Sequence, residues 1–94
     1  MKVMGYIETY EKNKILVIYE KMLALKELSY SVEDYVDNKE EKNSLIKSIK
    51  LDFLNEEINY EKNWNELIKK YNWKVDSSEN LILNFNDNTV LIKE

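Results

Sequence analysis

The first part of the chain repeats apolar side chains with the period of an α-helix. From about residue 11 to residue 36 they fall three, four or seven positions apart, at Ile15, Ile18, Met22, Leu25, Val32 and Val36. This spacing places them on one stripe of a helix that can face a core. Ser29 stands where the next apolar residue is due, so we expect the helix to bend or restart near residues 28–31.

Asp37 and Asn38 mark a boundary after this helix. Either residue can cap a second helix, with a glutamate three positions later completing a capping box. The second helix would turn six apolar residues towards the core: Leu45, Ile46, Ile49, Phe53, Leu54 and Ile58. A third, shorter helix would start at Asn59 or Asn63 and has the most regular stripe: Tyr60, Trp64, Leu67, Ile68 and Tyr71.

After Asn72 the pattern alternates, as in β-strands. Leu81, Leu83 and Phe85 face one way, and Val90 and Ile92 follow a turn at residues 86–88. Residues 73–75 are expected to add a third short strand, whereas residues 3–10 remain open between strand, helix and coil.

These patterns predict one α+β domain over residues 1–94. It is helical over about 11–72, with two longer helices and one short helix. An antiparallel β-hairpin follows over about 80–93, alone or within a three-stranded meander.

The chain lacks the side chains on which most catalytic sites depend. The 94 residues include no histidine, cysteine or proline, and all 14 basic residues are lysines. Histidine is the usual general base and a common metal ligand, and cysteine the usual thiolate. We therefore expect no enzymatic activity, no cofactor and no metal site.

Carboxylate pairs and the hairpin end leave two alternatives open, an enzyme site and a metal site. A pair of carboxylates can still act as acid and base, and a polar pocket holding two carboxylates and a lysine would revive an enzyme interpretation. The hairpin end, with Asn84, Asn86, Asp87 and Asn88, offers oxygen ligands, but residues of this kind are usually turn formers.

Seven residues are predicted to contact a partner. Glu33, Asp37, Glu40 and Glu41 form an acidic cluster, which either caps a helix and complements its dipole or faces a basic partner. Tyr30, Tyr35 and Trp73 lie off the apolar stripes and supply aromatic anchors.

The function we predict is a non-enzymatic protein-binding module. Its profile resembles, in type only, the small accessory proteins of phages and mobile elements, such as antitoxins, immunity proteins and inhibitors of defence nucleases. The partner would be another protein, including a basic one that binds nucleic acid. A homodimer through the stripe of residues 15–36 is also open.

Nucleic acid and membrane are not expected partners, because the net charge is −4 and no apolar run is long enough to span a bilayer. No apolar leader follows Met1, so we expect the cytoplasm. The alternative function is a winged-helix-like DNA-binding regulator that reads DNA with residues 60–71 and uses residues 86–88 as its wing tip; the acidic charge argues against it.

Overall fold

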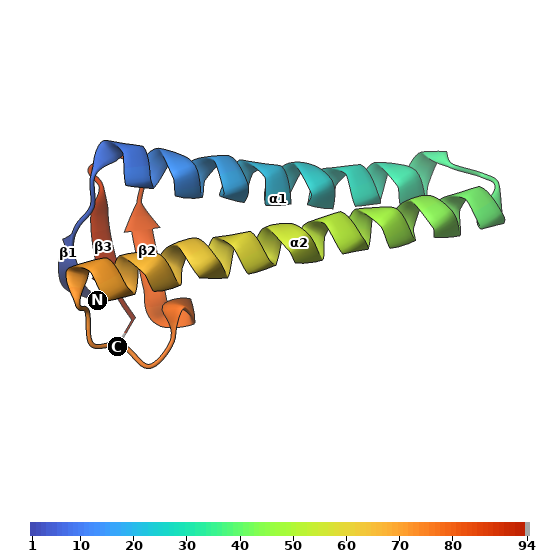
Figure 1. The fold of residues 1–94 in the computed structure, drawn as a ribbon. Coiled ribbons are helices and arrows are strands. Elements are labelled where there is room, and N and C mark those ends of the chain that lie inside the picture. The colour runs from blue at the N-terminus through green and yellow to red at the C-terminus, as the bar shows by residue number, and fades with distance from the viewer. Residues whose placement is uncertain (94) are drawn as a thin grey trace.

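The computed structural model describes residues 1–93 and confirms the α+β prediction. Two long helices pack antiparallel, and a short 3₁₀ turn and a three-stranded antiparallel sheet lie at one end of them (Figure 1). In chain order the elements are β1 (Lys2–Tyr6), α1 (Thr9–Tyr35), α2 (Lys39–Tyr71), η1 (Ser78–Asn80), β2 (Leu81–Asn84) and β3 (Thr89–Ile92).

Helix α1 runs without a break from Thr9 to Tyr35, so the restart that the sequence left open near residues 28–31 is wrong. The Ser29 hydroxyl donates a hydrogen bond of 3.0 Å to the carbonyl of Lys26 in the preceding turn. A serine that bonds back to its own helix in this way satisfies its hydroxyl without ending the helix.

Helix α2 is one 33-residue helix where two were predicted. Asn38 is its N-cap, since its side-chain oxygen accepts the N–H of Glu41 at 2.9 Å. Asn59 and Asn63 lie inside the helix, and the Asn63 amide donates to the Asn59 carbonyl at 2.8 Å. The helix ends at Asn72, which takes the left-handed conformation (φ 54°) that asparagine tolerates.

The two helices pack along one seam. On each helix the less exposed positions recur three and four residues apart, as in a coiled coil. The seam positions are Ile15, Ile18, Met22, Leu25, Ser29, Val32 and Val36 on α1 and Ile46, Ile49, Phe53, Glu56, Tyr60, Asn63 and Leu67 on α2. The stripe predicted for residues 15–36 is therefore confirmed, and α2 covers it.

Three residues predicted to face the core do not. Leu45, Leu54 and Ile58 are exposed. Helix α2 has a single stripe that α1 covers in this part of the molecule, and these three residues lie off that stripe.

The sheet has the strand order β1-β3-β2, with both pairs antiparallel. Residues 2–6 thus form the third strand, and the strand expected at residues 73–75 is wrong. The chain reaches β3 through a turn in which Asn88 has a φ of 62°, and Asn84 and Asp87 accept backbone N–H groups. The hairpin-end residues are turn formers here.

The core lies at the sheet end of the molecule. It consists of Ile7, Ile15, Trp64, Leu67, Leu81, Leu83 and Val90. Beyond the sheet, residues 23–56 continue as a two-helix arm in which only Val32 and Ile49 are buried (Figure 1). The molecule is consequently elongated, with extents of 49 × 25 × 24 Å. Within the described residues, neither helix contains an apolar stretch of the length that crossing a membrane requires.

Candidate functional site

The far end of the arm gathers six of the seven predicted contact residues. Helix α1 ends at Tyr35 and α2 begins at Lys39, so the connection between them forms a tip remote from the sheet (Figure 1). We define the tip as residues 30–42. It contains Tyr30, Glu33, Tyr35, Asp37, Glu40 and Glu41, all exposed to solvent.

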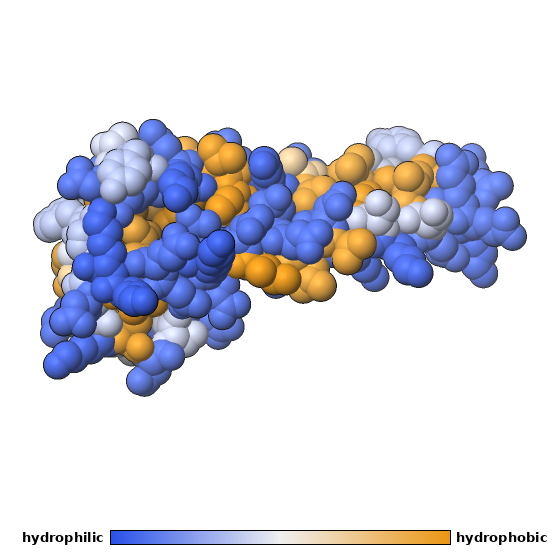
Figure 2. Space-filling model, viewed as in Figure 1, coloured by the Kyte–Doolittle hydropathy of each residue, from blue (hydrophilic) through white to orange (hydrophobic). Residues whose placement is uncertain are grey.

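The tip holds most of the net charge of the protein. Five acidic residues and two lysines lie within residues 30–42, which gives −3 of the total −4. Most of its surface is hydrophilic (Figure 2). Within residues 1–93, no group of three or more acidic side chains is placed to hold a metal ion.

The local geometry explains why the tip is ordered. Asn38, not Asp37, caps α2, and Glu40 and Glu41 lie in the first turn, where the helix dipole favours negative charge. The Lys42 ammonium donates to the Glu33 carbonyl at 2.9 Å and ties α2 to the last turns of α1. The glutamates therefore stabilise a helix end while their carboxylates remain accessible.

Tyr30 and Tyr35 flank the tip and do not form one flat patch. They are 57% and 83% exposed. Five residues of α-helix correspond to a rotation of about 140°, so the two rings point to different sides of α1. A partner that touches both rings must enclose the end of the arm.

Trp73 does not join this surface. It follows α2 at the sheet end and stacks on Tyr71 with ring centroids 5.1 Å apart. A Cβ atom on Gly5 would lie 3.2 Å from the indole nitrogen, so the strand backbone passes close to the ring. Trp73 is half-buried and packs against the core.

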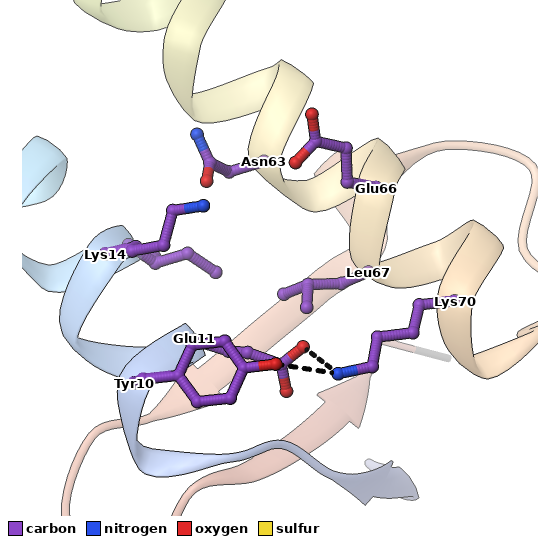
Figure 3. Close-up of a pocket in the computed structure, with 8 residues that line it drawn as sticks. Tyr10, Glu11, Lys14, Asn63, Glu66, Leu67 and Lys70 are labelled. Atoms are coloured by element: carbon purple, nitrogen blue, oxygen red, sulfur yellow. Dashed lines mark hydrogen bonds and ion pairs between the residues drawn. The ribbon is translucent and has the colours of Figure 1, made fainter.

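A polar pocket lies between the first turns of α1 and the last turns of α2 (Figure 3). Its volume is about 200 Å³, and its lining includes two carboxylates, Glu11 and Glu66, and two lysines, Lys14 and Lys70. This composition is the one that would revive an enzyme interpretation. The hydrogen bonds of Glu11 distinguish a catalytic role of this pocket from a structural one.

Glu11 is buried, and its carboxylate accepts three hydrogen bonds. The Lys70 ammonium donates at 2.8 Å, the Glu8 backbone N–H donates at 2.8 Å, and the Tyr71 hydroxyl also donates. Lys70 in turn donates to the Tyr10 hydroxyl at 3.0 Å. The cluster joins the start of α1 to the end of α2, across about 60 residues of sequence.

The charges of this cluster are fixed by its contacts. Burial alone would raise the pKa of Glu11, but the hydrogen bonds from Lys70, Tyr71 and the Glu8 backbone outweigh burial and bring the pKa below its ordinary value. Hydrogen bonding to Glu11 raises the pKa of Lys70 and of Tyr71. A general acid or base works best with a pKa near the working pH, and these shifts lead away from neutrality. We interpret the cluster as a structural brace.

Residues 60–71, the recognition helix of the DNA-binding alternative, do not form a helix of their own. They are the last turns of α2, and Trp64 and Leu67 in their stripe are buried in the core beside the sheet. The stripe itself was predicted correctly as a core stripe. The winged-helix alternative loses the separate recognition helix on which it depended.

Comparisons with known proteins add no functional assignment. No protein-family model, no curated protein and no solved structure matches this chain significantly. A functional proposal for this chain therefore rests on its own surface.

Proposed function

We propose that this protein is a protein-binding module that engages a basic surface of another protein with the tip of its arm. One observation carries the proposal. The acidic charge and two exposed tyrosines are concentrated at the end of an ordered arm, far from the core that the rest of the chain builds.

The physical chemistry of the tip suits recognition. A local charge of −3 accelerates the approach of a basic partner and disfavours acidic ones. Tyrosine buries a large, rigid ring at low entropic cost and keeps a hydroxyl for hydrogen bonding. Because the helices and the Asn38 cap already order the tip, binding costs little conformational entropy.

The geometry favours a partner with a basic groove. Since the two tyrosines face different sides of α1, a groove that takes in the whole tip contacts both. Lysine- and arginine-lined grooves of this kind occur where proteins hold nucleic acid phosphates. We therefore propose a nucleic-acid-binding protein as the partner, with inhibition by competition as the outcome; an inhibitor, antitoxin or immunity activity would each take this form.

The proposal is tested by changing the tip and a matched site at the other end. The tip variant combines Glu33→Lys with Tyr35→Ala. The control combines Glu79→Lys with Tyr6→Ala, also an exposed glutamate and an exposed tyrosine but at the sheet end. Tagged wild-type protein is used to capture a partner from the source cells, and the purified partner is titrated calorimetrically with each variant.

We expect a basic partner whose dissociation constant rises at least about tenfold with the tip variant and stays unchanged with the control, because removal of a central interface anchor costs about 2 kcal/mol or more. Nucleic acid should compete with wild-type protein for the partner. A partner that binds the tip variant normally and fails to bind the control would refute the assignment.

A further inference from the structure

Helix α2 carries a second apolar stripe that nothing in the monomer covers. Leu51, Leu54 and Ile58 are 60%, 52% and 56% exposed. They are three and four positions apart, so they lie on one line of the helix, distinct from the seam that packs on α1. Figure 2 shows hydrophobic surface along the outer edge of α2 in this part of the molecule.

Four of the charges beside this stripe are arranged with opposite sign about its centre. Lys47 and Lys50 lie seven and four residues before Leu54, and Glu57 and Glu61 lie three and seven residues after it. These four charged residues and the three apolar ones recur three or four positions apart, so they lie together along one side of α2, which we call the band. A band of this kind is complementary to itself when one copy is reversed.

Reversal corresponds to an antiparallel pair of α2 helices that cross at Leu54. Leu51 of one copy then lies beside Ile58 of the other, and the two Leu54 side chains meet at the two-fold axis. Lys47 and Lys50 lie beside the Glu61 and Glu57 of the second copy. A parallel pair would instead place lysine against lysine and glutamate against glutamate, which is unfavourable.

The chain exposes more surface than a compact monomer of its mass, which leaves area available for such a pair. Its accessible surface is 6955 Å². A compact monomer of 11.3 kDa exposes about 5,700 Å², so this chain exposes about 1,200 Å² more. A stable interface of standard size buries about 800 Å² on each partner. The radius of gyration, 16.4 Å against about 12 Å for a compact domain of this length, has the same origin in the arm.

We propose that the protein forms a two-fold symmetric homodimer through Leu51, Leu54 and Ile58, with α2 antiparallel to α2 of the second copy. The contact is isologous, since each copy contributes the same band. It is separate from the tip, and it directs the two tips towards opposite ends of the assembly. The stripe of residues 15–36, which the sequence left open as a dimer contact, is covered by α2 and does not contribute to this dimer.

The first test is the mass in solution, measured by sedimentation equilibrium over a range of concentrations. Wild-type protein should reach twice 11.3 kDa and no larger species. Leu54→Glu places two like charges at the axis and should give a monomer, whereas Val17→Glu, at an exposed valine of α1, should leave the dimer intact. Circular dichroism melting shows that both variants fold. A wild-type monomer at every concentration, or an open series of larger assemblies, would overturn the proposal.

The second test addresses the charges. Lys47→Glu with Lys50→Glu gives a chain that is acidic at all four positions, and Glu57→Lys with Glu61→Lys gives one that is basic at all four. Each should be monomeric by itself, and an equimolar mixture should dimerise. Failure of the mixture to dimerise would overturn the electrostatic register.

The absence of cysteine allows a third test, of helix direction. With single cysteines and a short bis-maleimide reagent, Lys47→Cys should cross-link to Glu61→Cys in a mixture. Cross-linking of Lys47→Cys to itself, without the mixed product, would show a parallel pair and overturn the proposed orientation.

Discussion

At the residue scale, Glu11 is the side chain with the most consequential environment. It is a buried carboxylate with three donors, one of them charged, and it links α1 to α2 beside the core. Removal of one partner from a buried, charge-assisted network leaves the others unsatisfied, which is more costly than the net value of the bonds.

Glu11→Gln should lower the free energy of unfolding by about 2 kcal/mol at neutral pH, the usual cost for hydrogen bonds to a charged group. Because the pKa of Glu11 is lower in the folded state, its carboxylate stabilises the fold above the ordinary value of 4.5. That contribution is lost as the pH falls through the lower folded-state pKa. Urea unfolding at neutral pH and well below pH 4.5 measures both effects.

Glu27→Gln is the control for this measurement, because Glu27 is exposed on the same helix. It should unfold like wild type at either pH. A Glu11→Gln protein that is as stable as wild type at neutral pH, or one whose deficit grows on acidification, would contradict the brace.

The environments of some of these side chains could be predicted from the sequence. Tyr30 and Tyr35 were predicted as partner contacts because they lie off the helical stripe, and the structure shows both side chains exposed. Trp73 also lies off a stripe, yet it packs on Tyr71 and Gly5, which follow from the path of the chain around the sheet. Glu11 gave one usable clue, its position four residues before Ile15 on the apolar stripe of α1.

At the element scale, the arm is a thin structure with polar interruptions in its seam. Ser29 occupies a seam position of α1, and a groove lined by Leu25, Lys26, Ser29, Ile49, Lys50 and Phe53 opens beside it. A serine contributes little apolar area there, so the packing of α1 on α2 is locally incomplete.

Ser29→Leu should stabilise the protein by about 1 kcal/mol, since a leucine fills the groove and restores the stripe. For a domain of this size that corresponds to an increase in melting temperature of roughly 4–8 °C. Thermal melting followed by circular dichroism measures the shift. Ser31→Leu, at an exposed serine two residues later, should leave the melting temperature nearly unchanged; an equal shift in both variants would show that helix propensity, not packing, is responsible.

Several elements set by local pattern were predicted correctly, although α2 was wrongly divided near Asn59 and Asn63, and the strand set by distant pairing was left open. The α1 stripe, the cap at Asn38 and the hairpin of β2 and β3 depend on neighbours within a few residues. Strand β1 exists because it pairs with β3 almost the whole chain away. The stripe of Leu54 and Ile58 was correctly placed on a helix, but periodicity cannot say which of two apolar stripes is covered.

At the scale of the whole molecule, the core and the tip that we propose as the binding site occupy different ends. The core beside the sheet holds the fold together, and the arm projects an acidic tip away from it. Lysine is the only basic residue type in the chain, and histidine and cysteine are absent from its sequence. We propose that the partner binds at this location, residues 30–42.

Site-specific photo-cross-linking tests that location most directly. A photoreactive phenylalanine replaces Tyr35 at the tip in one protein and Tyr6 at the sheet end in another, both at strongly exposed tyrosines. We expect irradiation in the source cells to join the Tyr35 derivative to one basic protein and the Tyr6 derivative to none. Cross-linking of the partner from Tyr6 and not from Tyr35 would contradict the account.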